Sequence, residues 1–192
     1  MMAFSSKQKP LTCPRLVAVG GLIASGKSTL SGHLGERLAA PVISSDRTRK
    51  QMANRSPMDF RQEPLWQGIY SPEQTEKVYA ELMRQARVAL DSGRSVILDA
   101  SFRTEAYRNA AQKIALDSGV PFRFLECRVD PEICRSRLRQ RESEPSISDA
   151  REALFEDFLQ KWEPDESQEN HVVVDTTRPF EETFDMLRPW LL

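Results

Sequence analysis

Short apolar runs alternate with stretches of helical periodicity along most of the chain. In the periodic stretches, apolar residues recur three and four positions apart, which is the spacing of one helix face. The run that ends at Leu98 has no polar alternation, as expected for a parallel strand buried on both faces. The apolar runs predict strands over residues 15–19, 41–45, 95–98, 121–129 and 171–176. The periodic stretches predict helices over 27–39, 71–91, 104–116, 130–141, 150–162 and 180–187, and a short helix that opens at residue 47.

This alternation of strands and helices predicts an α/β fold with a parallel sheet and right-handed crossovers. Pro189 is expected to end the last helix before it, because proline cannot donate to the helical ladder. The periodicity fails over residues 53–70, where prolines and a glycine interrupt an apolar, aromatic segment. That segment is interpreted in two ways, as the lining or lid of a substrate pocket or as an ordered surface loop.

Residues 21–28, GLIASGKS, lie between the first predicted strand and the first predicted helix. They match the P-loop pattern G-x-x-x-x-G-K-[ST], whose glycines let the backbone wrap around a phosphate while helix-terminal N–H groups point at it. Lys27 would neutralise the β- and γ-phosphates of a bound nucleotide. Ser28 would hold Mg²⁺, which prefers oxygen ligands. The residues expected to contact the nucleotide are Gly21, Ala24, Ser25, Gly26, Lys27, Ser28 and Thr29.

Asp46 follows the second predicted strand, and Arg49 lies one helical turn further on. Ligand groups gather at the carboxyl ends of the strands in open α/β sheets, so Asp46 is expected near the P-loop. Its carboxylate could accept a proton from a substrate hydroxyl or hold water on Mg²⁺, and Arg49 could brace the transferring phosphate. The alternative interpretation is a helix-capping aspartate followed by a solvated basic turn.

Asp99 ends the third predicted strand, downstream of the P-loop, and resembles a Walker B aspartate. It is expected beside Ser28, where it would organise the Mg²⁺ shell. The alternative is a strand-end aspartate that caps the next helix.

Four arginines, at positions 135, 137, 139 and 141, lie on the helix predicted over 130–141, before a polar, proline-containing loop and another helix. At most two of them can share one helix face. This helix–loop–helix over about 135–150 resembles the lid of small P-loop kinases, in which an arginine swings over the phosphates. Arg135, Arg139 and Arg141 are the candidates for that role, and a solvated arginine face is the alternative.

Nearly the whole chain resembles the small P-loop kinases of the polynucleotide-kinase, zeta-toxin and gluconate-kinase type, which are also called AAA family ATPases. The resemblance is carried by residues 21–28, by Asp46 with Arg49, by the strand ending at Asp99 and by the arginine-bearing helix. It implies a three-layer P-loop NTPase fold with a five-stranded parallel sheet in the order 2-3-1-4-5 and a helical lid. It also implies ATP and Mg²⁺ as cofactors. The residues it implies for catalysis are Lys27, Asp46, Arg49, Arg135 and Arg139, and those for the metal are Ser28 and Asp99.

The composition limits the classes of protein further. A length of 192 residues suggests one domain, expected over 15–192 after a loose polar tail of 14 residues. The net charge of -1 gives no general attraction to nucleic acid. The three cysteines have no metal-ligand or disulfide spacing, and no apolar run is long enough to span a membrane. We therefore expect a cytoplasmic monomer or weak dimer.

The leading hypothesis is an ATP-dependent kinase that phosphorylates a hydroxyl group. The acceptor stays open between a nucleic-acid 5′-hydroxyl, a nucleotide sugar and a small metabolite. The alternative is a regulatory module that binds ATP without transferring phosphate, and the sequence does not distinguish ATP from other nucleoside triphosphates.

Overall fold

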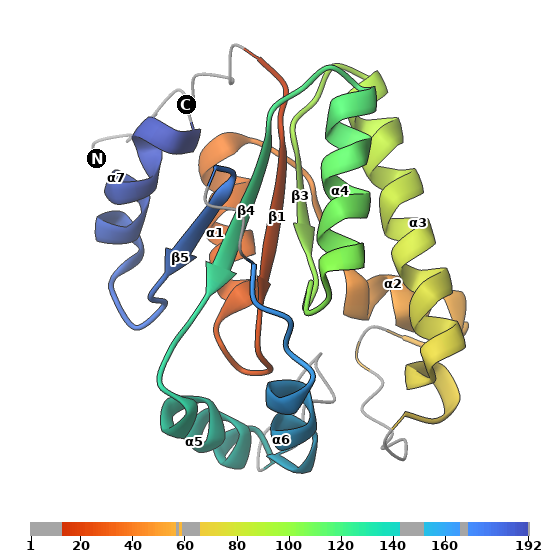
Figure 1. Ribbon diagram of the computed structural model, residues 1–192, viewed down its shortest axis with the longest axis vertical. Helices are drawn as coiled ribbons and strands as arrows, with labels where there is room; N and C mark the ends of the chain where they lie inside the picture. The colour runs from red at the N-terminus through yellow and green to blue at the C-terminus, as the bar shows by residue number, and fades with distance from the viewer. Residues whose placement is uncertain (1–12, 57, 59–65, 143–151, 166–168, 192) are drawn as a thin grey trace, which may run out of the picture.

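A parallel sheet forms the centre of the molecule (Figure 1). The computed structural model describes residues 13–56, 58, 66–142, 152–165 and 169–191. Five strands lie in the order β2-β3-β1-β4-β5, and all neighbouring pairs are parallel. In that order the strands are Val42–Ser44, Val96–Asp99, Leu16–Gly21, Phe122–Cys127 and His171–Val174. The expected fold class and the expected strand order are both confirmed.

Helices cover both faces of the sheet and give the molecule three layers (Figure 1). Helices α1 and α7 lie on one face, α3 and α4 on the other, and α2 follows β2 directly. Helices α5 and α6 lie beyond the carboxyl ends of the strands. The helices are Lys27–Leu38 (α1), Ser45–Met52 (α2), Pro72–Asp91 (α3), Glu105–Asp117 (α4), Pro131–Glu142 (α5), Glu152–Gln160 (α6) and Phe180–Leu191 (α7), with a 3-10 turn η1 at Gly68–Tyr70.

The central strand shows why the apolar runs lack alternation. All six residues of β1 are buried. Because successive strand side chains point to opposite faces, Leu16 and Ala18 pack with α3 and α4, and Val17 and Val19 pack with α1 and α7. The central strand is thus covered on both faces, and the carboxyl edge of the sheet is the side that faces α5 and α6 (Figure 1).

Some predicted boundaries move. Strand β2 ends at Ser44, so Asp46 lies in the first turn of α2 rather than at the end of a strand. Several predicted segments fall partly outside the described residues: the tail (1–12), the 53–70 segment (57 and 59–65) and the lid (143–150). The division into a tail and a single domain stays a prediction.

The expectation that the last helix stops before Pro189 is wrong, because α7 continues to Leu191. Pro189 lies in the final turn, where it removes only its own N–H bond to the carbonyl four residues earlier. Two guanidinium groups bond carbonyls at the free end of the helix: Arg15 donates to the Leu191 carbonyl, and Arg123 Nε donates to the Trp190 carbonyl at 3.0 Å. Burial of Leu191 against the sheet gives the extra turn its apolar anchor.

None of the helices in the described part of the chain is long and apolar enough to cross a membrane.

Candidate functional site

The P-loop joins β1 to α1 at the carboxyl edge of the sheet. Gly21 and Gly26 have φ angles of 138° and 91°, and Ala24 also has a positive φ of 61°. A β-carbon at Gly26 would lie 2.6 Å from Thr176 Oγ1, so no larger residue fits there without displacing its neighbour. The loop therefore curls back toward the start of α1 in a way that glycine permits.

The N-terminus of α1 is open to an anion. Gly26 is its N-cap residue and supplies no side-chain acceptor, so the first N–H groups of the helix have no side-chain cap. Lys27 Nζ donates to the carbonyl of Leu22 at 2.6 Å, which keeps the ammonium against the loop. Unsatisfied N–H groups, the positive end of the helix dipole and an ammonium group form a site for phosphate.

Asp99 lies beside Ser28, as expected from the sequence. Its carboxylate accepts hydrogen bonds from the hydroxyls of Ser28 and Ser44, and Ser44 is its register partner on β2. Burial raises the pKa of Asp99, while Lys27 and these hydrogen bonds oppose the rise. Strand pairing thus brings a P-loop hydroxyl and a buried carboxylate together.

These two oxygen donors fit Mg²⁺. No group of three or more His, Cys, Asp or Glu side chains in the described ranges is arranged to hold a metal by itself. Mg²⁺ commonly takes only one or two protein oxygens and completes its shell with waters and nucleotide phosphates. Ser28 would be a direct ligand, and Asp99 would hold a ligating water.

Asp46 lies one strand away from this pair, in the first turn of α2. Its Oδ2 is 3.3 Å from Lys50 Nζ, and the Lys50 side chain is fully buried. The Tyr70 hydroxyl lies 3.4 Å from Asp46 Oδ1. Because Lys50 is buried, the turn is not the solvated basic turn considered as the alternative. No pattern in the sequence indicates a role for Lys50, since lysine is rarely fully buried.

Arg49 is held against the turn η1. One terminal nitrogen donates to the Ile69 carbonyl at 2.6 Å and to Thr75 Oγ1 at 3.2 Å. Its guanidinium also lies 5.0 Å from the centre of the Tyr70 ring. Burial lowers the pKa of Arg49 below its usual value. Its expected contact with the transferring phosphate stays a prediction.

The arginines of α5 point in different directions. Arg135 is ion-paired with Glu132 and with Glu156 of α6, so it joins the two helices. Arg137, two positions further on, donates to the Ala24 carbonyl of the P-loop at 3.1 Å. Arg139 is exposed. Arg137, which was not among the predicted lid arginines, therefore lies on the P-loop. Phosphate contacts for Arg135 and Arg139 stay predictions. Arg141 lies where side chains are not described.

A small apolar cluster explains why α5 sits on the P-loop. Ala24 is buried together with Cys134, Leu138 and Phe155. Cys134 and Leu138 lie one turn apart on α5, and Phe155 belongs to α6. This P-loop cluster fixes the position of α5 relative to the nucleotide-binding loop.

A pocket of about 320 Å³ opens next to the start of α1. The His33 and Phe180 rings form one wall, with their centroids 4.8 Å apart. The Thr176 hydroxyl donates to the Ser25 carbonyl at 2.6 Å and so links the turn after β5 to the P-loop. The described lining residues are Gly26, Thr29, Leu30, His33, Arg137, Thr176, Arg178, Phe180 and Thr183. These residues come from segments that are far apart in the sequence. The pocket could therefore be predicted only from a strand order that brings the turn after β5 near the P-loop.

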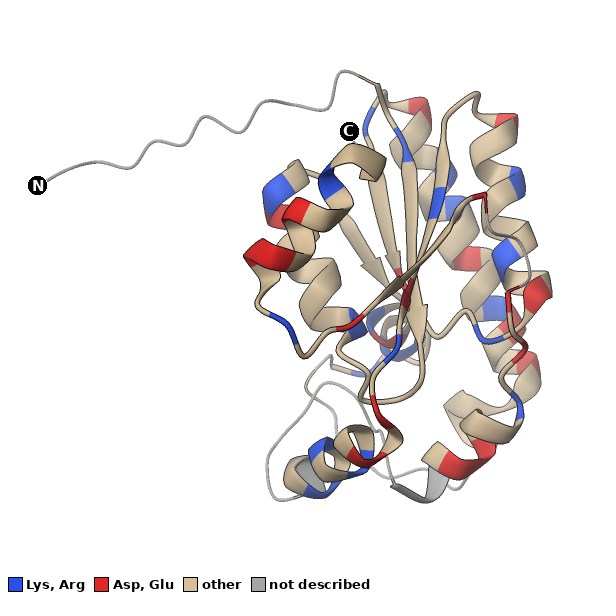
Figure 2. Cartoon of the chain, turned by 60° about the vertical axis from the view of Figure 1, so that its left-hand side comes forward, with Lys and Arg blue, Asp and Glu red and all other residues tan. Residues whose placement is uncertain are grey.

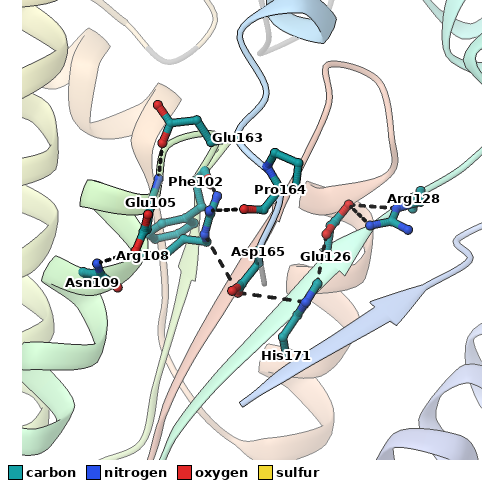
Figure 3. A network of polar contacts seen from close by, with 10 residues as sticks. All are labelled: Phe102, Glu105, Arg108, Asn109, Glu126, Arg128, Glu163, Pro164, Asp165 and His171. Carbon is teal, nitrogen blue, oxygen red and sulfur yellow. Dashed lines mark hydrogen bonds and ion pairs between the residues drawn. The ribbon is translucent and has the colours of Figure 1, made fainter. Parts of the chain in front are cut away.

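A polar network ties the segment after α6 back to the sheet (Figure 3). His171 on β5 lies 2.9 Å from the buried Glu126 of β4 and 3.9 Å from Asp165. Arg108 of α4 lies 3.9 Å from Asp165, and Arg128 lies 2.8 Å from Glu126. Asp165, which follows α6, is therefore linked to β5 through His171 and to α4 through Arg108.

Comparisons with known proteins bear on these features. Residues 16–164 match the family model AAA_33, described as an AAA domain. The uncharacterized protein Rv2004c of Mycobacterium tuberculosis (strain ATCC 25618 / H37Rv) is 33% identical over 124 residues, which cover 65% of this chain. The match spans only 25% of the length of that protein.

Two solved structures share the fold. A gluconokinase from Sinorhizobium meliloti 1021 has a TM-score of 0.63 and 19% identity, over 90% of this chain and 88% of that chain. The Mycobacterium tuberculosis APS kinase CysC, in complex with AMPPNP and APS, has a TM-score of 0.67 and 18% identity, over 95% of this chain and 99% of that chain. At such low identity the likeness concerns the fold.

Proposed function

Because the chain belongs to the AAA domain family and has the fold of P-loop kinases, we propose that it transfers the γ-phosphoryl group of a nucleoside triphosphate to a substrate hydroxyl. The observation that carries this proposal is the placement of Asp46 one strand away from the Ser28–Asp99 pair. A P-loop alone would serve any nucleotide-dependent process. A carboxylate beside it, at the carboxyl edge of the sheet, can in addition receive a proton from a substrate hydroxyl.

The nucleotide is proposed to be ATP, with its phosphates on the P-loop and its base in the neighbouring pocket. The ring pair of His33 and Phe180 offers a surface for stacking, and Arg137 can reach both the loop and the pocket. Mg²⁺, when bound, would neutralise part of the charge on the phosphates. Ser28 and Asp99 are the residues that would hold it.

In the proposed reaction, a bond forms between the acceptor oxygen and the γ-phosphorus, and the bond from that phosphorus to the β–γ bridging oxygen breaks. The hydroxyl proton passes to Asp46. The nucleoside diphosphate leaves with the electron pair of the broken bond, as negative charge on its β-phosphate. Lys50 Nζ lies 3.3 Å from Asp46 Oδ2 and so holds the carboxylate in position. A carboxylate is a sufficient base, because phosphoryl transfer has a loose transition state and the proton leaves late.

Charge on the transferring group would be neutralised by Lys27 and by one arginine of α5. Arg137 is the arginine we favour, since its guanidinium already lies on the P-loop at the Ala24 carbonyl. Such groups catalyse by positioning and electrostatic stabilisation rather than by covalent chemistry.

The test is transfer of labelled γ-phosphate from ATP to a panel of sugars, sugar phosphates, nucleosides, nucleotide sugars and 5′-hydroxyl oligonucleotides. We expect transfer to one class of acceptor, lost in Lys27→Ala and strongly reduced in Asp46→Asn. Asp91→Asn, an exposed acid at the end of α3, is the matched control and should keep full activity.

Full transfer by Lys27→Ala would refute the proposal. Tight ATP binding without transfer to any acceptor would instead favour a regulatory module that binds nucleotide and phosphorylates nothing.

A further inference from the structure

Tyr79 is a buried polar residue of α3 that has no part in the reaction described above. It is 5% exposed, and its hydroxyl reaches the connection that follows β3. The hydroxyl lies 3.2 Å from Ser101 Oγ and accepts a hydrogen bond from Phe102 N at 3.0 Å. We call residues 100–104 the β3 loop. Tyr79 therefore joins a helix on one face of the sheet to a loop at its carboxyl edge.

The hydrogen bonds of Tyr79 determine where its proton lies. Because the Phe102 N–H can only donate, the phenol oxygen is the acceptor in that bond. Burial raises the pKa of Tyr79, so the phenol keeps its proton at neutral pH. Among the described residues, Ser101 Oγ is the acceptor within hydrogen-bond distance of that proton. Tyr79 thus donates to Ser101.

Ser101 keeps a hydroxyl proton of its own to donate. A serine hydroxyl accepts through its lone pairs, so the bond from Tyr79 does not use its hydrogen. No other side chain or carbonyl in the described ranges forms a hydrogen bond with Ser101 Oγ. Ser101 is only half-buried, so part of it is accessible. Its hydroxyl is therefore a donor that Tyr79 holds in place and that an incoming oxygen can meet.

The β3 loop lies against the P-loop. The Ser101 carbonyl accepts a hydrogen bond at 3.0 Å from the N–H of Gly21, the first residue of the P-loop. Ser101 also follows Asp99 by two positions, and Asp99 bonds to Ser28. Strand β3 lies between β1, which leads into the P-loop, and β2, which leads to Asp46. Ser101 thus lies between the nucleotide side and the acceptor side of the carboxyl edge.

The backbone of the β3 loop is strained. Phe102 has a φ of 47°, a region that is unfavourable for residues other than glycine. Tyr79 holds Phe102 through the hydroxyl bond to its N–H and through an edge-to-face ring contact with centroids 5.6 Å apart. Arg108 donates to the Phe102 carbonyl at 3.0 Å. Such strain persists only where surrounding groups hold the geometry, so the orientation of the loop depends on Tyr79.

The strands beneath the β3 loop carry few charges. In Figure 2, charged residues of both signs lie mainly on the described helices and connections rather than on the strands. Ala100 and Phe102, the neighbours of Ser101, are buried. Water therefore screens hydrogen bonds only weakly here, and a hydroxyl that accepts one hydrogen bond is a stronger donor in the next.

Resting on the proposed function, we propose that Ser101 donates a hydrogen bond to the γ-phosphoryl group of the nucleotide, and that Tyr79 is the positioning residue that orients it. No proton is transferred along this chain, because both hydroxyls act only as donors. A neutral donor that is already oriented stabilises charge on the phosphoryl oxygens during transfer. The reacting hydroxyl is a less suitable target, since a hydrogen bond to its oxygen would occupy a lone pair on the attacking atom.

The first experiment compares two nucleotides that differ in the γ-phosphoryl group. Calorimetric titrations in the presence of Mg²⁺ give the Kd for ADP and the Kd for AMPPNP. We expect Ser101→Ala to raise the Kd for AMPPNP about tenfold and that for ADP by less than about twofold, since only AMPPNP carries the contacted oxygen. Ser101→Thr, which keeps a hydroxyl, should recover most of the affinity.

Tyr79→Phe tests the positioning role, because it keeps the ring and removes the hydroxyl. It should raise the Kd for AMPPNP in the unaltered background and have no further effect in the Ser101→Ala background, since it acts through Ser101. Tyr107→Phe is the matched control. The Tyr107 ring stacks on that of Tyr79, with centroids 3.6 Å apart, but its hydroxyl donates to the exposed Glu76 at 2.7 Å. This control should leave both Kd values unchanged.

Three results would overturn the inference. An unchanged Kd for AMPPNP in Ser101→Ala would show that the hydroxyl does not touch the γ-phosphoryl group. Equal losses of affinity for ADP and AMPPNP would show that the substitution only disturbs the P-loop through Gly21. A Tyr79→Phe effect that persists in the Ser101→Ala background would show that Tyr79 acts on the fold rather than through Ser101.

The second experiment measures transfer to the acceptor that the panel identifies. We expect kcat to fall at least about tenfold in Ser101→Ala, while the KM for the acceptor changes by less than about twofold. A raised KM for the acceptor with an unchanged kcat would assign Ser101 to the acceptor, which would overturn the inference and leave the kinase intact. Weakened AMPPNP binding in Ser101→Ala, with no transfer to any acceptor by the unaltered protein, would refute the kinase and leave the γ-phosphoryl contact standing.

Discussion

Asp46→Asn is the obvious test of the proposed base, but the structure predicts that it also destabilises the fold. Asp46 forms an ion pair with Lys50, whose side chain has no exposed surface. Asparagine would keep the size of the side chain and remove its charge. The Lys50 ammonium would then remain buried and lose the carboxylate that lies 3.3 Å from it.

The size of the effect follows from the burial of the two groups. Removing one partner of a buried ion pair costs about 3–5 kcal/mol. The Asp46 side chain is 23% exposed, so water partly screens the pair, and we expect a cost below that range, about 2–3 kcal/mol. For a chain of 192 residues, each kcal/mol lowers Tm by roughly 2–4 °C. Asp46→Asn should therefore lower Tm by roughly 4–12 °C.

A double-mutant cycle separates stability from catalysis. Thermal and urea unfolding would be measured for Asp46→Asn, Lys50→Met and the double variant, with Asp91→Asn as the surface control. Lys50→Met should cost less than Asp46→Asn, because the remaining carboxylate is partly hydrated whereas the lysine is not. The double variant should be more stable than Asp46→Asn alone and still lack transfer.

Two outcomes would contradict this reasoning. One is an Asp46→Asn protein as stable as the Asp91→Asn control. The other is a double variant whose loss of stability equals the sum of the two single losses, since that would show no coupling between the charges.

Three further predictions concern the nucleotide side. Because burial raises the pKa of Asp99, affinity for Mg²⁺–ATP should fall on acidification at a pH above the usual range of aspartate, and Asp99→Asn should lose this pH dependence in calorimetric titrations. The same raised pKa means that the nucleotide-free native state holds the proton more tightly than the unfolded chain, so stability should decline as pH rises through that window. Gly26→Ala should destabilise the protein by roughly 1–3 kcal/mol in urea unfolding and weaken ATP binding. The reason is that the new β-carbon would lie 2.6 Å from Thr176 Oγ1, at a residue whose φ is 91°. An unchanged affinity for ATP would count against this geometry of the loop. Arg137→Ala should raise the Kd for ATP about tenfold. Arg135→Ala breaks exposed ion pairs, so it should shift stability by less than about 1 kcal/mol and leave the Kd for ATP nearly unchanged. A larger rise in Kd for Arg135→Ala than for Arg137→Ala would favour Arg135 as the phosphate-binding arginine.

The sheet could be predicted from the sequence because its signals are local. Unbroken apolar runs identify strands buried on both faces, and the P-loop pattern identifies the first strand and helix. Strand order came from the family resemblance, since local patterns carry no information about which strands are neighbours. The end of α7 was misjudged because the contacts that hold its last turn come from Arg15 and Arg123, which lie far away along the chain.

The choice among the arginines of α5 could not be made from the sequence. Cys134 and Leu138 define its buried face, and Arg135 and Arg137 lie on opposite flanks of that face. Which flank meets the P-loop depends on how the helix is rotated against α6, and that is decided by Phe155. A periodic pattern gives the buried face of a helix but not the identity of its neighbours.

Lys50 was missed for a related reason. Its sequence context, a basic turn after an aspartate, is typical of a solvated surface. Burial there depends on how α2 packs against α3 and η1, which brings Tyr70 and Thr75 over the turn. The residues that complete the acceptor side are therefore set by tertiary contacts.

The P-loop cluster has a consequence for local stability. In the described chain, α5 and α6 are joined to the rest of the core through few fully buried side chains, those of Ala24, Cys134, Leu138 and Phe155. Regions with few buried apolar contacts open at free energies well below that of global unfolding. A nucleotide at a hundred times its Kd contributes about 2.7 kcal/mol to the state that binds it. Because Ala24 belongs both to the cluster and to the nucleotide-binding loop, amide hydrogen exchange in α5 and α6 should slow when nucleotide binds, while the strands of the sheet keep their rates.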